Sequence, residues 1–149
     1  MTVTDPFPGL PSPDTRPEIY DGVPLKRGFA WLIDAVLTGL LTALALPLTA
    51  FLGLFFFPFL YMLVGFLYRW VTLSNGSATP GMRLAAIELR NRYGETFDAG
   101  TAFMHTLGYT LSVSIFPLQL VSIALMLISE RGQGLSDHVL GTTAVNKMI

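Results

Sequence analysis

The stretch from Gly28 to Tyr68 reads GFAWLIDAVLTGLLTALALPLTAFLGLFFFPFLYMLVGFLY and contains one formal charge, that of Asp34. A helix that crosses the roughly 30 Å hydrocarbon core of a bilayer needs about 20 residues, and this stretch is about twice that length. Proline and glycine interrupt it between Pro47 and Gly53. The pattern therefore predicts two membrane-spanning helices, at about 28–47 and 53–73, that are joined by a tight hairpin.

A second apolar stretch, from Ala99 to Ser129, contains no Asp, Glu, Lys or Arg. Pro117 lies near its middle and can break a helix because proline has no backbone N–H donor. We favour two short helices, at about 101–114 and 118–129, that form a hairpin. Each would be only about 20 Å long and would not cross fully, so its tip would need protein around it. One long tilted span with a proline kink is the alternative.

The composition also indicates a membrane protein. Of the 149 residues 52% are hydrophobic and 13% are charged, and the formal net charge is −1, whereas soluble domains carry about 25% charged residues. This composition excludes an ordinary water-soluble enzyme and a disordered chain. The chain has no basic excess and no cysteine, which excludes a nucleic-acid binder and a disulfide-stapled module. We expect no enzymatic activity, no cofactor and no metal, because no phosphate loop, ligand cluster or nucleophile–base pair is visible.

Two polar regions complete the predicted fold, an all-α membrane bundle with a small cytoplasmic two-stranded β element. Residues 1–24 hold six of the ten prolines and are predicted to be a disordered cytoplasmic tail, which leaves residues 25–149 as the membrane domain. Alternating side chains suggest a short strand at 84–90, and residues 142–147 are also strand-like. Because lone strands are unstable, we expect these two to pair, which requires both on the same side of the membrane.

The basic residues predict the orientation through the positive-inside rule. The hairpin between the first two spans contains no Lys or Arg. The other side holds Lys26, Arg27, Arg69, Arg83, Arg90 and Arg92. We therefore predict a multi-pass protein of the inner (plasma) membrane with a cytoplasmic N-terminus. Tyr68, Arg69 and Trp70 are predicted to anchor the second span at the interface.

Asp34 lies about 10 Å inside the first predicted helix, where an unpaired carboxylate would cost several kcal/mol. Helical periodicity places Arg27, Asp34, Thr38 and Thr42 on one face, beside small residues that admit a neighbouring helix. Two interpretations are open. Asp34 either belongs to a charge network that holds the helix ends, or it takes up a proton or a cation during transport.

His105 and Ser112 share one face of the third apolar segment. Together with Thr38 and Thr42 they are candidates for a polar seam that faces Asp34. A His–Asp pair in a partly wet cavity can relay protons. The alternative is that the small residues on this face only allow the helices to pack.

Three blocks, in this order, resemble the RDD family of small membrane proteins, which is named for an Arg–Asp–Asp set. Lys26–Asp34 (KRGFAWLID) is similar to the family's opening arginine, alanine and aspartate. Gly76–Leu84 (GSATPGMRL) is similar to its Thr-Pro-Gly loop and the strand after it. Arg131–Thr142 (RGQGLSDHVLGT) is similar to its closing aspartate and Gly-Thr strand. The resemblance covers about residues 25–147.

The resemblance implies that the family's named residues correspond to Arg27, Asp34 and Asp137. It also implies a membrane location, and some family members have been linked to transport of ions or small solutes. This sequence departs from the family pattern at two places. Met82 stands where a lysine is usual, which removes one cation from the loop, and His105 lies near a place where an arginine is common.

If the two strands pair, Asp137 returns to the cytoplasmic end of the first helix, near Arg27 and Arg83. We therefore predict that Arg27, Asp34, Arg83 and Asp137 form one interfacial network. Such a network would clamp the first helix to the polar loop and to the C-terminal segment.

Two functions are compatible with these patterns. The first is a transporter of protons, cations or small solutes with Asp34 as the coupling carboxylate; one chain has too few helices to enclose a polar path, so it would act as a homo-oligomer. The second is a structural or accessory protein of the membrane, in which the Arg/Asp set only stabilises the bundle and the polar segments hold a membrane-protein partner. Both have the lipid bilayer as a partner, and neither involves nucleic acid.

Overall fold

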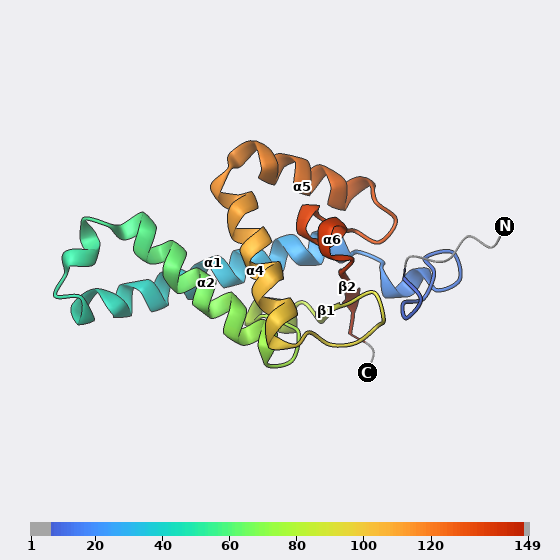
Figure 1. Cartoon of the computed structure of the whole chain (residues 1–149), viewed down its shortest axis with the longest axis horizontal. Coiled ribbons are helices and arrows are strands. Elements are labelled where there is room, and N and C mark those ends of the chain that lie inside the picture. The colour runs from blue at the N-terminus through green and yellow to red at the C-terminus, as the bar shows by residue number, and fades with distance from the viewer. Residues whose placement is uncertain (1–6, 148–149) are drawn as a thin grey trace.

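The computed structural model describes residues 7–147, which are mostly helical and include one small sheet (Figure 1). The helices are α1 (Val23–Leu48), α2 (Phe57–Ser74), α3 (Pro80–Leu84), α4 (Ala99–Ser114), α5 (Phe116–Ile128) and α6 (Leu135–Leu140). Two 3-10 turns, η1 (Pro17–Ile19) and η2 (Leu52–Leu54), and two strands, β1 (Ile87–Arg90) and β2 (Thr143–Asn146), complete the fold. Figure 1 shows the turn between α1 and α2 at one end of the molecule and the sheet toward the other.

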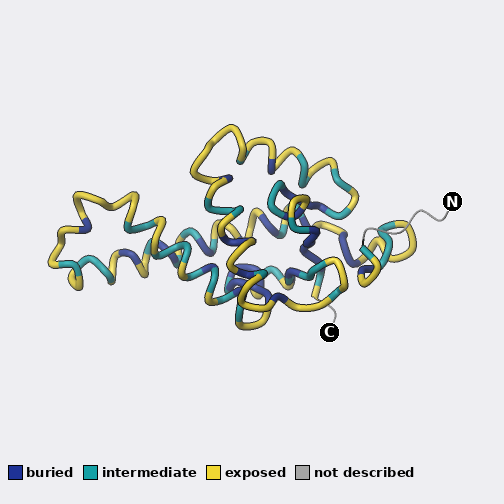
Figure 2. The backbone as a smooth tube through the Cα atoms, viewed as in Figure 1, coloured by how far each residue is buried: buried dark blue, intermediate teal, exposed yellow. Residues whose placement is uncertain are grey.

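Helices α1 and α2 form the apolar arm of the molecule. The segments Pro17–Leu48 and Phe57–Ser74 are long and apolar enough to cross a membrane. Many of the arm's large side chains are exposed, Leu48 to 89% and Phe55 to 81%, and Figure 2 shows this exposure at the tip. Such a continuous apolar surface is typical of a face that contacts lipid or another protein.

The ends of the two spans differ slightly from those predicted. Helix α1 begins at Val23 instead of residue 28, because Gly22 takes a left-handed conformation at the N-cap and Pro24 fits the first turn. Helix α2 begins at Phe57 instead of residue 53, because η2 takes up part of the connection. The tip is tightly packed, since a Cβ on Gly53 would lie 2.7 Å from Leu60 Cδ2.

Helices α4 and α5 meet at Ile115 with a bend of 116°. Pro117 lies in the first turn of α5, so the break comes just before the proline, where a missing N–H leaves no helical bond unmade. A corner this sharp favours the predicted helical hairpin over one long kinked span. The pair counts as a third apolar segment that could enter a membrane only if its two helices are taken together.

The predicted pairing of the two strands is confirmed. Strands β1 and β2 are antiparallel, with Ile87 opposite Asn146 and Arg90 opposite Thr143. The first strand is shorter than predicted because residues up to Leu84 form α3. Apolar side chains of the sheet and of the adjoining helix ends form the buried core, which contains Val23, Ala30, Leu73, Ala78, Met82, Ile87, Leu89, Phe97, Ala102 and Ala144.

Residues 7–22 pack against this sheet, in contrast to the disordered tail predicted for residues 1–24; residues 1–6 lie outside the described part of the chain. Leu10, Ile19 and Tyr20 are buried together with Val145 of β2. Asn146 Nδ2 donates hydrogen bonds to the carbonyls of Glu18 and Asp21, each at 2.8 Å. The proline-rich composition indicated disorder, but the apolar residues between the prolines find a partner in the C-terminal strand.

Candidate functional site

The carboxylate of Asp137, on α6, is fully buried and joins three helices. Arg27 Nη1 on α1 donates to its Oδ2 at 2.5 Å. His105 Nε2 on α4 lies 2.9 Å from Oδ1, and it is the donor because an ionised carboxylate only accepts. Thr142 Oγ1 donates to Oδ1 at 2.7 Å, and the Gly134 N–H to Oδ2 at 3.1 Å. Four donors therefore satisfy one buried acceptor.

The surroundings of Asp137 keep it ionised. Burial by itself raises the pKa of a carboxyl, but the Arg27 guanidinium and the hydrogen bonds from His105 and Thr142 outweigh burial and hold the pKa of Asp137 well below its usual range. The pair is nearly inaccessible, with side-chain exposures of 8% for Arg27 and 0% for Asp137. Loss of either partner would leave an uncompensated buried charge.

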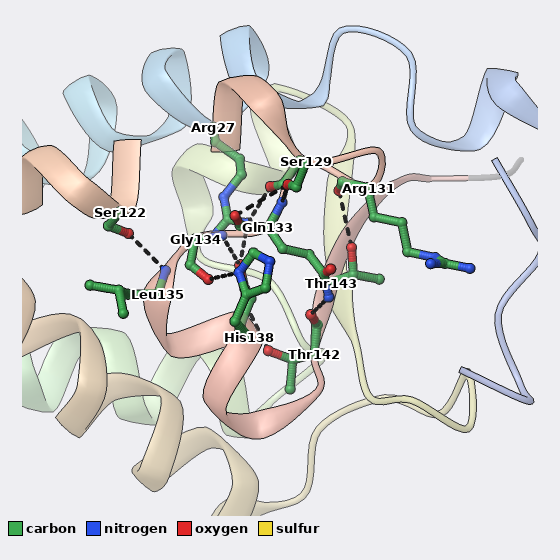
Figure 3. A network of polar contacts seen from close by, with 12 residues as sticks. Arg27, Ser122, Ser129, Arg131, Gln133, Gly134, Leu135, His138, Thr142 and Thr143 are labelled. Carbon is green, nitrogen blue, oxygen red and sulfur yellow. Dashed lines mark hydrogen bonds and ion pairs between the residues drawn. The ribbon is translucent and has the colours of Figure 1, made fainter. Parts of the chain in front are cut away.

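The loop between α5 and α6 holds this ion pair in place (Figure 3). Its polar groups bond to α1, α5 and the β2 segment. The bonds run from Arg27 Nη1 to Gly132 O (3.2 Å), from Leu135 N to Ser122 Oγ (3.1 Å), from Gln133 Nε2 to Thr142 O (2.7 Å) and from Thr143 Oγ1 to Arg131 O (3.2 Å). The loop therefore couples the end of α5 to the sheet.

Asp34 forms a second, separate cluster. Its Oδ1 accepts hydrogen bonds from Tyr68 Oη at 2.7 Å and from the Gly81 N–H at 2.9 Å. Its Oδ2 accepts a bond from Thr79 Oγ1 at 2.5 Å. Among residues 7–147, Asp34 forms no ion pair within 4.0 Å. Its donors are hydroxyls and a backbone amide instead of an arginine.

The structure divides the predicted four-residue network. It brings Arg27 and Asp137 together, but Asp34 belongs to the other cluster. Arg83 is exposed, and its Nη2 donates to the carbonyl of Asn75 at 2.7 Å. The division arises because the start of α3 supplies Thr79 and the Gly81 amide to Asp34, while the Arg83 guanidinium bonds to the Asn75 carbonyl instead.

The predicted polar seam is also divided. Thr38 and Thr42 are buried, but Thr42 Oγ1 donates to the Thr38 carbonyl of its own helix. Ser112 Oγ donates to Gln119 Oε1 at 3.0 Å and so connects α4 with α5. His105 pairs with Asp137 and not with Asp34. No direct His105–Asp34 hydrogen bond therefore exists among the described residues.

Two cavities meet at Asp34. The larger, of about 440 Å³, lies among α1, α4 and α5, and its lining includes Arg27, Asp34, Arg69 and His105. The smaller, of about 170 Å³, lies among α1, α2 and α4. The side chains that line both are Trp31, Asp34, Arg69, Tyr109 and Val113. Asp34 and Arg69 thus lie at the boundary between the two spaces.

The sequence profile of the RDD family matches residues 22–141. The chain belongs to the RDD family. Comparisons with curated proteins and with solved structures found no match to this chain. The region matched by this RDD profile contains Arg27, Asp34 and Asp137, so both buried carboxylates lie within the family's own segment.

Arg69 is the residue of this RDD protein whose position the sequence did not predict. Its side chain is buried within the protein, since only 7% of the residue is exposed. The guanidinium Cζ lies 4.0 Å from the centroid of the Tyr109 ring. The sequence does contain a pattern that indicates this burial. Tyr61, Gly65 and Arg69 recur every four residues and so share the face of α2 that packs on α1. Gly65 allows this approach, as a Cβ there would lie 3.3 Å from Thr38 Cγ2.

The neighbours of Arg69, Tyr68 and Trp70, both donate hydrogen bonds within the protein. Tyr68 donates to Asp34, and the indole N–H of Trp70 donates to the Ala99 carbonyl at 3.1 Å. Across residues 7–147, no three His, Asp or Glu side chains come together as a set that could hold a metal ion. The described side chains therefore include two buried carboxylates (Asp34 and Asp137), two buried arginines (Arg27 and Arg69) and the buried His105.

Proposed function

We propose that this RDD-family protein is a multi-pass transporter of the inner (plasma) membrane that moves protons, cations or small solutes, with Asp34 as the group that binds and releases the ion. The observation that carries the proposal is the position of Asp34. Of the carboxylates that the structure describes, it alone lines both cavities, and it is 7% exposed. An ionisable side chain inside a membrane bundle commonly lies on an ion or proton pathway.

The two clusters give the two buried carboxylates, Asp34 and Asp137, different roles. Asp137 is neutralised by Arg27 and has a structural role, since its exchange with a passing ion would break a buried pair. Asp34 has no ion-pair partner within 4.0 Å among residues 7–147, and two of its three donors are the hydroxyls of Tyr68 and Thr79. A hydroxyl can donate or accept, so the cluster can accommodate either a charged or a protonated Asp34 by rotating these groups.

The orientation and assembly follow from the same proposal. The charge distribution supports a cytoplasmic location for residues 7–22 and the sheet, with the α1–α2 turn on the opposite side. Two apolar helices and one bent pair are too few to enclose a continuous polar path in one chain. The exposed apolar surface of the α1–α2 arm gives homo-oligomers a face through which to assemble.

A structural or accessory role is the second candidate, and one observation favours it. The two hydrogen bonds to Asp34 from Thr79 and the Gly81 amide fasten α3 directly to α1, with such a close approach that a Cβ on Gly81 would lie 2.2 Å from the Ala30 carbonyl oxygen. In this role Asp34 only stabilises the bundle, and the polar segments contact another membrane protein.

Flux in proteoliposomes separates the two functions. We expect the purified protein to move protons or cations down an imposed pH gradient, and we expect Asp34→Asn to abolish this flux while its melting temperature shows that the fold persists. Asp21→Asn is the matched control, because Asp21 is exposed outside the cavities. Flux that survives Asp34→Asn, or a folded unsubstituted protein without flux, would contradict the transport proposal.

A further inference from the structure

We propose that the 440 Å³ cavity beside α5 binds an amphiphile whose head is an oxyanion, either a carboxylate or a phosphate monoester, and that the guanidinium of Arg69 holds this head. The proposal goes beyond transport, because it concerns binding alone and stands whether or not Asp34 couples to flux. It depends on unmet hydrogen-bonding capacity among the polar residues that line the cavity and on the apolar character of its other walls.

Arg69 is the main polar group of the proposed binding site. It is more than nine-tenths buried, and its Nε has no hydrogen-bond partner within residues 7–147. No ion pair within 4.0 Å involves Arg69 in this part of the chain. The Tyr109 ring covers the face of the guanidinium, and the N–H donors of a guanidinium lie in its plane. These donors therefore remain available to an acceptor in the cavity.

Asp34 does not satisfy this need, although it lines the same cavity. Its two oxygens already accept three hydrogen bonds, from Tyr68, Thr79 and the Gly81 amide. It balances charge in the region without supplying Arg69 with acceptors. A carboxylate or a phosphate presents two oxygens that can accept two parallel N–H···O bonds from a guanidinium.

His105 supplies a second unmet group. It also lines the larger cavity, is fully buried, and has no partner for its Nδ1 among the described residues. Because its Nε2 donates to Asp137, a neutral His105 has an acceptor at Nδ1. The P–OH of a singly ionised phosphate monoester matches this acceptor, while its charged oxygens match Arg69.

The walls of the cavity explain why the ligand is an amphiphile and not a free inorganic anion. Helix α5 contributes Phe116, Ile123, Met126 and Leu127, and α4 contributes Val113. A small hydrated anion would leave these apolar walls without contacts, whereas an alkyl chain covers them. Small-molecule sites usually combine such walls with a few polar groups, in volumes of about 300–1,000 Å³.

Quenching of Trp31 fluorescence tests the proposal. The chain has two tryptophans, and Trp31 lines the cavity whereas Trp70 does not, so Trp70→Phe leaves a single reporter. In nonionic detergent we expect 9,10-dibromostearate to quench Trp31 saturably, at a concentration about tenfold or more below that needed for its uncharged methyl ester, since charge-assisted hydrogen bonds are the stronger class. Arg69→Gln should remove the difference between the two probes.

Arg83→Gln is the matched control, because Arg83 is exposed and does not line the cavity; it should keep the preference for the acid. Equal quenching by acid and ester in the Trp70→Phe protein would overturn the proposal, as would a preference that survives Arg69→Gln. The acid–ester comparison uses no substitution at Arg69, so it still tests the proposal if Arg69→Gln does not fold.

A third probe identifies the source of the amphiphile. Dibrominated phosphatidic acid carries a phosphate monoester head on two chains. Quenching at a concentration similar to that of dibromostearate would assign the site to a bilayer lipid, whereas quenching about tenfold weaker would assign it to a free single-chain amphiphile. Either result supports an oxyanion-headed ligand, provided that it depends on Arg69.

Discussion

Asp137 accepts hydrogen bonds from Arg27 on α1, from His105 on α4 and from Gly134 and Thr142 on either side of α6. A single carboxylate thereby connects three helices and the beginning of the β2 segment. Asp34, by contrast, connects α1 only to the α2 and α3 region. The two carboxylates thus have different partners and different expected responses to substitution.

Replacing Asp137 by asparagine should destabilise the protein by about 3–5 kcal/mol, since removal of one member of a buried ion pair leaves the other without compensation. Thermal or denaturant unfolding in detergent measures this change. Glu18→Gln is the matched control, because the Arg16–Glu18 pair is exposed; its loss should leave the stability nearly unchanged, since exposed ion pairs contribute little. Equal effects of the two substitutions would show that Arg27 and Asp137 do not form a buried pair.

The same variant should change the pH dependence of stability. Because the pKa of Asp137 is lowered in the folded protein, its stabilisation is fully present above the unfolded carboxyl pKa of about 3.9. The stabilisation is lost as the pH falls below that value toward the folded pKa. The melting temperature of the unsubstituted protein should therefore drop between roughly pH 5 and pH 2 more steeply than that of Asp137→Asn.

Among the helices and strands, α3 is the element whose placement matters most for the Asp34 cluster. Thr79 caps this short helix, as its Oγ1 accepts from the Met82 N–H at 3.2 Å while donating to Asp34. Gly81 in its first turn lies directly against the backbone of α1. The Thr-Pro-Gly sequence therefore combines a cap, a helix-starting proline and a residue small enough for contact.

Gly81→Ala should disrupt this contact, because the new Cβ would lie 2.2 Å from the Ala30 carbonyl oxygen and 2.8 Å from Asp34 Oδ1. We expect a loss of about 1–3 kcal/mol or more, measured by unfolding in detergent. Gly28→Ala is the matched control, since a Cβ on Gly28 would meet nothing within 4 Å; it should be neutral or stabilise α1 by up to about 1 kcal/mol. If Gly81→Ala unfolds like Gly28→Ala, the close approach of α3 to α1 is wrong.

At the scale of the whole molecule, the paired strands constrain the path of the chain through the membrane. Strand β1 follows the second span and β2 follows the bent α4–α5 pair. Because β1 and β2 share one sheet, we propose that the apolar segment between them enters and leaves the membrane on the same side. Residues 7–22, which pack on β2, belong to that side as well.

Single-cysteine labelling tests this topology cleanly, since the natural chain has no cysteine. A membrane-impermeant maleimide should label Asp14→Cys and Glu95→Cys from the same side and Phe55→Cys, at the α1–α2 turn, from the other. Phe116→Cys, at the corner of α4 and α5, should be protected from both sides. Labelling of Phe116→Cys from the same side as Phe55→Cys would show that the bent pair crosses the membrane.

Local patterns were sufficient to predict much of this fold. The apolar runs predicted the two spans, Pro117 predicted the break between α4 and α5, and side-chain alternation predicted the strands that pair. The resemblance of three blocks to the RDD family was also confirmed. These features depend on residues within one turn, one strand or one helix length of each other, so they can be identified without knowledge of the packing.

Only the tertiary structure decided which buried groups meet. Whether Asp34 binds an arginine or the Thr79 and Tyr68 hydroxyls depends on how α3 docks on α1, and the burial of Arg69 depends on how closely α2 approaches α1 and α4. The order of residues 7–22 likewise depends on cover from β2. Each of these contacts joins segments far apart in the sequence, and their stability comes from mutual burial and hydrogen bonding, which no single segment contains.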